Sequence, residues 1–258
     1  MPEAGLPPFF ELAAPPAWRA IDFISDLHLC QALPRTFDAF AAHLLHTPAD
    51  AVFILGDLFE AWVGDDMGER GFELLCVELI AEAASHRQLA FMVGNRDFLV
   101  GARFLRSSGC MGLPDPTVLD AWGQRVLLSH GDALCIADTP YQTFRTEVRS
   151  ATWQAGFLAK PLRERLQIAA DIRKVSQGRR QFDGAADADV DIAAAVQWMH
   201  GMGAREMVHG HTHRPGSAAL APGYKRHVLS DWDLDQGSRA EVLRLTRAGF
   251  KRLPPDHG

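Results

Sequence analysis

The sequence predicts an α/β fold in which short buried strands alternate with helices. Apolar runs of about four to seven residues recur along the chain and are rich in Val, Ile, Leu and Phe, which favours strands. Longer helix-like stretches separate the first of these runs, the pattern of a layered α/β protein. The length of 258 residues fits one large domain, or one domain with a sizeable insertion. A content of 47% hydrophobic and 22% charged residues excludes a disordered chain.

The first half of the chain predicts strand, helix, strand, helix and strand in that order. The strands are AIDFIS at 20–25, AVFILG at 51–56 and QLAFMVG at 88–94. The helices are TFDAFAAHLLH at 36–46 and RGFELLCVELIAEAASH at 70–86. Ligands of such folds gather at the carboxyl ends of strands, so the residues just after these runs are the expected place of a site.

The second half of the chain predicts further strands on both sides of a helical stretch. They are RVLLS at 125–129, REMVHG near 205–210, RHVLS at 226–230 and AEVLRLT at 240–246. The last two alternate apolar and polar residues more strictly than the earlier runs do. Such alternation favours a mixed or two-sheet core over a purely parallel sheet.

Residues 1–18 are expected to form a flexible extension. The first 20 residues contain five prolines and no basic residue before Arg19, whereas a secretory signal starts with positive charge and continues with an unbroken apolar stretch. A transmembrane run of about 18 apolar residues is also missing. Four cysteines without a CxxC pair suit a reducing compartment, and a net charge of −6 argues against a general nucleic-acid binder. We therefore expect a cytoplasmic protein.

A helical insertion is predicted between the strands at 125–129 and 205–210. Residues 139–175 have helical spacing, and Pro161 is expected to divide two helices. We therefore divide the chain into a core, residues 19–138 and 192–250, and a cap, residues 139–191.

The cap is basic although the whole chain is acidic. Between Lys160 and Arg180 there are seven basic and two acidic residues, a local balance of +5. The segment is therefore either a solvated helical insertion or a cap that meets an anionic, partly apolar ligand or an anionic membrane surface. An acidic cluster follows that is typical of a helix start: Asp183, Asp187, Asp189 and Asp191.

Metal-binding side chains follow five of the predicted strands, in the motifs DLH, GD, GNRD, HGD and GHTH. In an extended Asp-x-His or His-x-His segment both side chains point the same way, because strand side chains repeat every two residues. Each motif alone is common, but five in this order are not a coincidence. Seven donors with a shared carboxylate fit two metal ions: Asp26, His28, Asp57, Asn95, His130, His211 and His213.

The motif series resembles the calcineurin-like metallophosphoesterases over residues 20–235, which implies an αββα sandwich, here with a helical cap insertion. The longer segments ISDLHLC, ILGDLFEAWVGDD, GNRDFLVG, SHGDALCIAD and HGHTHRP are similar to one family among them, the UDP-2,3-diacylglucosamine diphosphatases of the lipid A pathway in Gram-negative bacteria.

This resemblance implies a role for each donor and a binuclear Mn²⁺ centre, although the donor set also suits Fe or Zn. Asp26, His28 and His213 are expected to hold the first ion, and Asn95, His130 and His211 the second. Asp57 is expected to bridge the two ions. Four further carboxylates either orient these ligands or serve as turn and cap residues: Asp65, Asp66, Asp97 and Asp132.

Arg96 stands where most calcineurin-like enzymes have His. Arginine does not release its proton in a protein, but it can hold phosphate oxygens with two parallel hydrogen bonds. A site without a His to donate a proton suits a leaving group that departs as an anion. This favours a diphosphate over a phosphoprotein as the substrate. The resemblance implies direct attack of water on the uridylyl phosphorus, giving UMP and 2,3-diacylglucosamine 1-phosphate, with Arg96, Asp57 and Asn95 as the catalytic residues.

The resemblance also implies a lipid substrate that the cap helps to hold. Asp183 stands where some relatives have Lys, so Arg179 and Arg180 are candidates to replace that charge. Acyl-chain contacts or core packing explain Phe144, Trp153, Phe157 and Leu158 equally well. The substrate-binding residues expected are Asn95, Arg96, Asp138, Ser176, Arg180 and His211.

Three alternatives compete with this interpretation. The first is another phosphodiesterase or nucleotide pyrophosphatase of the same fold, the second a non-catalytic scaffold, and the third a nuclease. The scaffold is disfavoured because all seven donors are present, and the nuclease by the net charge. The expected partners are the glycolipid nucleotide and the anionic cytoplasmic surface of the inner membrane, which the protein binds peripherally, with no nucleic acid and no stable protein partner.

Overall fold

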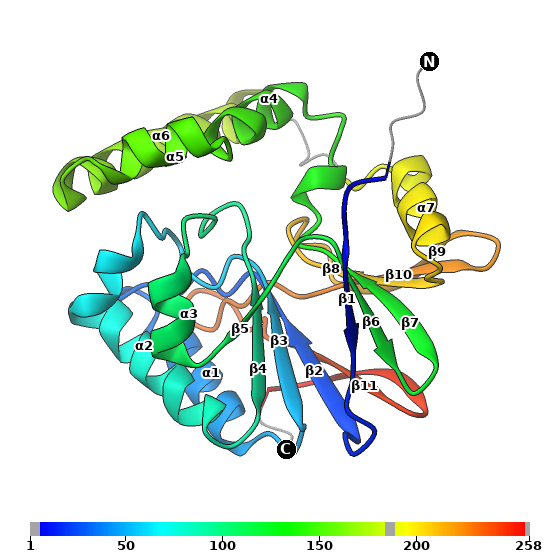
Figure 1. The fold of residues 1–258 in the computed structure, drawn as a ribbon. Helices are drawn as coiled ribbons and strands as arrows, with labels where there is room; N and C mark the ends of the chain where they lie inside the picture. The colour runs from blue at the N-terminus through cyan, green and yellow to red at the C-terminus, as the bar shows by residue number, and fades with distance from the viewer. Residues whose placement is uncertain (1–5, 184–188, 256–258) are drawn as a thin grey trace.

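Two six-stranded sheets pack face to face between layers of helices (Figure 1). The computed structural model describes residues 6–183 and 189–255, and within them the side chains except those of 175–183. One sheet has the order β1-β6-β7-β8-β10-β9 and the other the order β12-β11-β2-β3-β4-β5. Helices α1 to α3 cover the outer face of the second sheet, and α7 covers that of the first. This arrangement confirms the predicted αββα fold class.

The second sheet contains the strands predicted in the first half of the chain. Strands β2 to β5 are parallel, and β11 pairs antiparallel with both β2 and β12. Every residue of β3 is buried, as its unbroken apolar sequence predicts. The elements are β2 (Ala20–Ile24), α1 (Pro34–His46), β3 (Ala51–Leu55), η1 (Asp65–Glu69), α2 (Gly71–Ala84), β4 (Gln88–Met92), α3 (Ala102–Ser108), β5 (Met111–Leu113), β11 (Val242–Thr246) and β12 (Gly249–Leu253).

The first sheet is mixed and contains strands that the sequence analysis missed. Strands β1, β6 and β9 of this sheet were not predicted, and neither were β5 and β12 of the second sheet. Strand β8 pairs in parallel with both β7 and β10, while β6 with β7 and β9 with β10 form antiparallel pairs. The elements are β1 (Phe10–Ala13), β6 (Thr117–Ala121), β7 (Gln124–Leu128), η2 (Asp132–Leu134), α7 (Ile192–Gly201), β8 (Glu206–His209), β9 (Gly216–Ala221) and β10 (Tyr224–Val228).

The expectation of a flexible extension over residues 1–18 is wrong for β1. Residues Phe10–Ala13 pair in parallel with β6 at the edge of the first sheet. The prolines lie on either side of this strand and do not interrupt it, and an edge strand tolerates proline. Leu12 packs against the apolar core between the two sheets, which anchors the segment.

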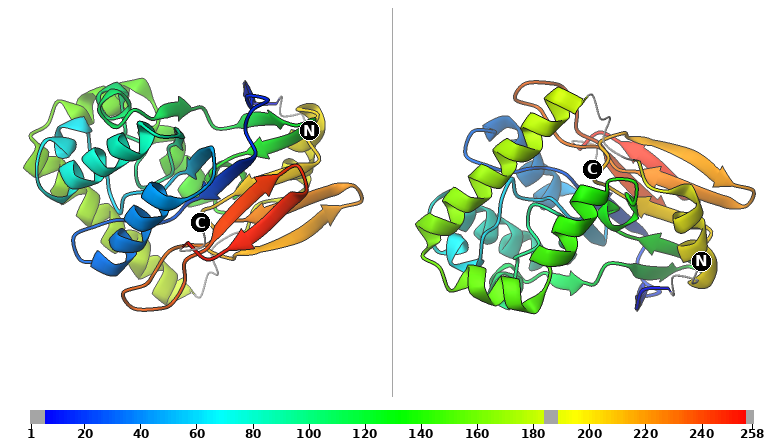
Figure 2. Two further views of the ribbon diagram at one scale, coloured as in Figure 1. Left: turned by 90° about the horizontal axis from the view of Figure 1, so that it is seen from below. Right: turned by 90° about the horizontal axis from the view of Figure 1, so that it is seen from above.

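Three cap helices lie across one end of both sheets (Figures 1 and 2). They are α4 (Thr139–Val148), α5 (Ala151–Leu158) and α6 (Leu162–Asp183). Pro161 separates α5 from α6 as expected, but the chain also breaks before α5, where the Ser150 side chain accepts a hydrogen bond from the N–H of Trp153 at 3.3 Å. Among the described residues, no helix is both long and apolar enough to cross a membrane.

Candidate metal centre

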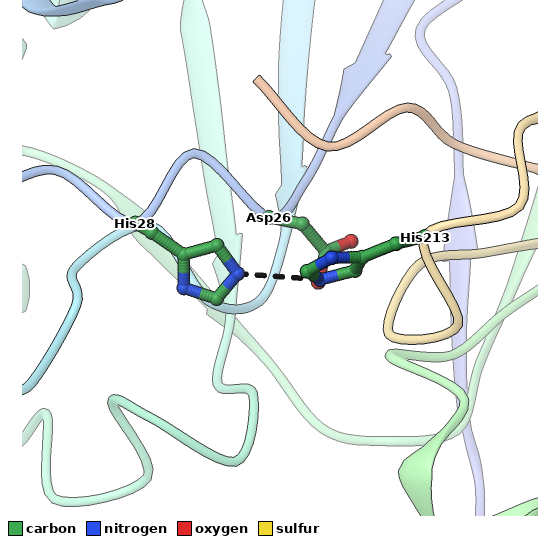
Figure 3. A group of neighbouring side chains, drawn as sticks. All are labelled: Asp26, His28 and His213. Atoms are coloured by element: carbon green, nitrogen blue, oxygen red, sulfur yellow. Dashed lines mark hydrogen bonds and ion pairs between the residues drawn. The ribbon is translucent and has the colours of Figure 1, made fainter. Parts of the chain in front are cut away.

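The predicted donors lie in loops that directly follow strands β2, β3, β4, β7 and β8. One donor atom each of Asp26, His28 and His213 lies within 4.8 Å of the others (Figure 3). Nε2 of His213 lies 3.3 Å from Nε2 of His28 and 3.4 Å from Oδ1 of Asp26. The structure therefore brings the three residues expected at the first ion together.

A second group lies beside the first and shares one carboxylate with it. Asp26, Asp57 and His130 also place donor atoms within 4.8 Å of one another. Nε2 of His130 lies 3.6 Å from Oδ1 of Asp57. Asp26 thus belongs to both groups by distance, and the bridging role of Asp57 stays a prediction.

Asn95 connects the remaining donors. Its Oδ1 atom lies 3.0 Å from Nε2 of His130 and 2.8 Å from Nδ1 of His211. The two imidazole rings are themselves 5.2 Å apart, centroid to centroid. All seven predicted donors therefore lie in one cluster at the end of the sheets that the cap covers.

The surroundings of His130 fit a bound cation. Nδ1 lies 2.9 Å from the carbonyl oxygen of Leu55, which can only accept a hydrogen bond, so Nδ1 carries a proton. In a neutral ring, Nε2 then points a lone pair toward oxygens of Asn95 and Asp57. Burial opposes a charge on this ring, but Asp57 and Asp26 raise the pKa of His130 to about 9. A metal ion bound among these atoms would supply the positive charge that these buried carboxylates favour.

The backbone at the donors has an unusual conformation. Five donors have positive φ: Asp26 at 55°, His28 at 50°, Asp57 at 52°, His211 at 68° and His213 at 51°. In the described chain, the one other non-glycine residue with positive φ is Trp122. Each such residue costs about 1–3 kcal/mol, and residues of this kind cluster at functional sites. The expectation that Asp-x-His and His-x-His converge through strand alternation is therefore wrong, because both donors of each segment have a left-handed and not an extended backbone conformation.

Two glycines make room for the donor carboxylates. A Cβ atom on Gly94 would lie 2.1 Å from Oδ1 of Asp57, and one on Gly210 would lie 2.3 Å from Oδ2 of Asp26. Both glycines immediately precede donors, Asn95 and His211. Their lack of a side chain lets the loops after β4 and β8 approach the carboxylates of neighbouring loops.

Asp97 connects two of the donor loops. Its buried carboxylate accepts hydrogen bonds from the N–H groups of Gly94 at 2.7 Å and Leu58 at 2.8 Å. Burial and the neighbouring Asp57 raise the pKa of Asp97 to about 6, although the hydrogen bonds from these two N–H groups lower it. Asp97 therefore orients ligand-bearing loops, which is one of the two roles expected for it.

Asp65 and Asp66 lie farther from the donors. The Asp65 carboxylate accepts from the N–H groups of Gly101 and Arg103, at 2.8 and 2.9 Å, and thus caps α3. Asp66 forms an ion pair with Arg165 of the cap helix α6. These two residues organise the core and the base of the cap.

Asp132 fixes the first cap helix beside the donors. Its buried carboxylate accepts hydrogen bonds from Tyr141 Oη at 2.6 Å and from Arg145 Nε at 2.8 Å. Although burial opposes ionisation, His130, Arg149 and Arg145 lower the pKa of this carboxyl. The Tyr141 ring in turn stacks on a donor, His211, with centroids 5.9 Å apart.

The sequence analysis missed Tyr141 and Glu60. Nothing in the local sequence marks Tyr141, because its role depends on how α4 packs. Glu60 did carry a signal, since it ends the GDLFE motif three residues after Asp57. Its Oε2 atom lies 3.3 Å from Nδ1 of His28, and its Oε1 atom lies 3.9 Å from Nη1 of Arg96.

The predicted substrate-binding residues of the cap are only partly described. Asp138 caps α4 by accepting a hydrogen bond from the N–H of Tyr141 at 3.0 Å. Trp153 and Phe157 stack 4.7 Å apart against the core, so packing accounts for both. Asp191 caps α7, as expected for a helix start. The predictions for Ser176, Arg179, Arg180, Asp183 and Asp187 lie outside the described side chains.

Comparison with known proteins agrees with this geometry. A model of the calcineurin-like phosphoesterase family matches residues 20–215. The UDP-2,3-diacylglucosamine hydrolase of Xanthomonas axonopodis pv. citri is 43% identical over 241 residues, which cover 88% of this chain and 95% of that protein. The protein of that name from Stenotrophomonas maltophilia is 41% identical over 242 residues, with the same coverage of 88% and 95%.

Among solved structures, Yfce, a phosphoesterase from E. coli, overlaps 92% of this chain and 93% of its own at a TM-score of 0.45 and 16% identity. That likeness is too loose to add to the family match. By the family match and the curated relatives, this chain belongs to the calcineurin-like phosphoesterases and, among them, to the family of hydrolases named UDP-2,3-diacylglucosamine hydrolase.

Proposed function

We propose that the chain hydrolyses the diphosphate bond of UDP-2,3-diacylglucosamine, giving UMP and 2,3-diacylglucosamine 1-phosphate. The observation that carries the proposal is the cluster of seven donors from five strand ends, with Arg96 in the same loop as Asn95. The substrate follows from the names of relatives that match 88% of the chain. The product places the enzyme in lipid A biosynthesis.

The donor set holds two divalent cations in this proposal. Asp26, His28 and His213 would hold one, Asn95, His130 and His211 would hold the other, and Asp57 would serve both. When bound, such ions lower the pKa of coordinated water and neutralise phosphate oxygens. A mixture of carboxylate, amide and imidazole donors suits Mn²⁺, which we propose as the metal.

The residues of the chain then position the diphosphate and stabilise its departing half. The Arg96 side chain is 20% exposed, and the N–H of this residue donates to Oδ1 of the donor Asp57 at 2.8 Å, which places Arg96 beside the cluster. Its guanidinium binds phosphate oxygens and keeps its proton, so no side chain at this position protonates the leaving group. The leaving sugar phosphate departs as an anion and needs no such proton. Water therefore attacks the phosphorus directly, without a Ser or Cys nucleophile.

A peripheral position on the cytoplasmic face of the inner membrane is also proposed. The basic segment between Lys160 and Arg180 supports it, together with Leu158 and Leu166 of the cap, each 42% exposed. Attraction of basic residues to anionic lipid weakens with salt. Sedimentation with vesicles of anionic lipid should therefore recover the protein at low salt and lose most of it at high salt. Equal recovery at both salt concentrations would count against this position.

One assay tests the activity against its main alternatives. The Mn²⁺-loaded protein should release UMP from UDP-2,3-diacylglucosamine much faster than it cleaves p-nitrophenyl phosphate or single-stranded DNA. In ¹⁸O-labelled water, direct attack places one label in UMP. Metal-loaded protein that releases no UMP would refute the substrate, and rapid cleavage of DNA would favour a nuclease.

A further inference from the structure

Glu60 contacts three different parts of the catalytic end of the molecule. It follows β3 and the donor Asp57, and its side chain is 17% exposed. The carboxylate lies 3.3 Å from Nδ1 of the donor His28 and 3.9 Å from Nη1 of Arg96. It also forms an ion pair with Nε of Arg173, on the cap helix α6, at 2.8 Å. One carboxylate thus meets a metal donor, the proposed phosphate-binding arginine and the cap.

The contact with His28 orients that ring. Nε2 of His28 points toward His213 and the first donor group, as Figure 3 shows, and Nδ1 points away from it. Glu60 is the acidic group within ion-pair distance of this buried Nδ1. A carboxylate behind a metal-binding imidazole fixes its tautomer and makes it a better ligand, and loss of such a partner typically costs 10- to 100-fold in metal affinity.

The contact with Arg173 joins the cap helix α6 to the same carboxylate. Helix α6 crosses the molecule above the core (Figure 2). Near its start, the buried Arg165 pairs with Asp66 of η1 and donates to the carbonyl oxygen of Val63. Two turns later, Arg173 reaches Glu60. The first pair holds α6 at the periphery of the core, and the second holds it over the metal centre.

We propose that Glu60 is a positioning residue that orients His28 for metal binding and, through its ion pair with Arg173, holds α6 over the metal centre. The inference rests on the proposed function only in taking the donor cluster to bind Mn²⁺. Its two parts predict two separate effects, one on metal affinity and one on the cap. Both effects can be measured without substrate.

Metal affinity tests the contact with His28. Calorimetric titration of metal-free protein with Mn²⁺ should show binding about 10- to 100-fold weaker in Glu60→Ala than in the wild type. Glu60→Gln should recover part of that loss, because its amide oxygen can take the place of the carboxylate oxygen beside Nδ1 of His28. Glu69→Gln removes an exposed carboxylate of η1 that pairs with Arg103, and this control should bind Mn²⁺ like the wild type.

Hydrogen exchange tests the contact with the cap. Backbone amides of residues 162–174 should exchange about two- to fivefold faster in Arg173→Met and in Glu60→Gln, the size expected for loss of one partly exposed ion pair. Combining the two substitutions should add nothing further, because both remove the same contact. Arg173→Met lies on the cap and should leave Mn²⁺ affinity unchanged, so it tests the contact with the cap even where a Glu60 variant unfolds at a lower temperature.

Two results would overturn the proposal. One is a folded Glu60→Ala variant whose Mn²⁺ affinity stays within twofold of the wild type. The other is unchanged exchange over residues 162–174 in Arg173→Met. Neither result bears on whether the wild-type protein releases UMP, so a failure of this inference is distinguishable from a failure of the proposed function.

Discussion

Replacing Gly94 by alanine tests whether close approach of two donor loops is what builds the metal centre. The new Cβ atom would lie 2.1 Å from Oδ1 of Asp57 and 2.5 Å from the backbone nitrogen of that residue. Both distances are about 1 Å shorter than ordinary contact, and a backbone atom cannot rotate away. The loop after β3 or the loop after β4 must therefore move by about 1 Å.

A shift of that size at the reacting atoms costs about 100-fold in rate. Gly94→Ala should therefore lower kcat for UMP release by about that factor, with a weakened affinity for Mn²⁺. Gly156→Ala is a matched control, because a Cβ atom on Gly156 in α5 would meet nothing within 4 Å. The control should keep full activity and gain up to about 1 kcal/mol of stability from helix propensity. A Gly94→Ala enzyme with kcat within threefold of the wild type would refute the steric reasoning.

The remaining predictions concern Arg96, Asp132 and the metal ions. Arg96→Ala should lower UMP release by at least about 100-fold while metal content, measured by mass spectrometry, stays at the wild-type level; wild-type turnover would reject its role. Asp132→Asn weakens three charge-assisted contacts and should cost about 2 kcal/mol in urea unfolding at pH 7. Because the pKa of Asp132 is held below its usual value, this difference should be complete above about pH 4 and shrink as the pH falls further; a constant difference would contradict that origin. Chelation by EDTA should abolish activity, and Mn²⁺ should restore it, whereas unchanged activity in the chelator would contradict a metal centre.

The identity of the donors could be predicted from sequence because each one follows an apolar strand. Carboxyl ends of strands in such a fold meet at one end of the sheets, so residue type and order were sufficient. The local geometry was not predictable from strand periodicity. Asp26 and His28 converge through positive φ values, which their neighbours impose: Gly210 leaves space beside Asp26, and the loop after β3 hydrogen bonds to the backbone of both donors.

Long-range contacts account for the other failures of the sequence analysis. Strand β1 is four residues long and pairs with a strand more than 100 residues away, so the local pattern carries little signal. The GDLFE motif contains Glu60, but the contact of this residue with the cap depends on Arg173, which lies on another element and in the other half of the chain. Charged residues that act through long-range tertiary contacts do not produce a periodic pattern in a single sequence.

The order of the donors along the chain also governs when the metal centre forms during synthesis. A nascent chain that ends within the cap already carries Asp26, His28, Asp57, Asn95 and His130, but it lacks both histidines that follow β8. It also lacks β11, the neighbour of β2 in the second sheet. Contacts between such distant segments form slowly and late. All seven donors can therefore come together only when translation of the core is almost finished.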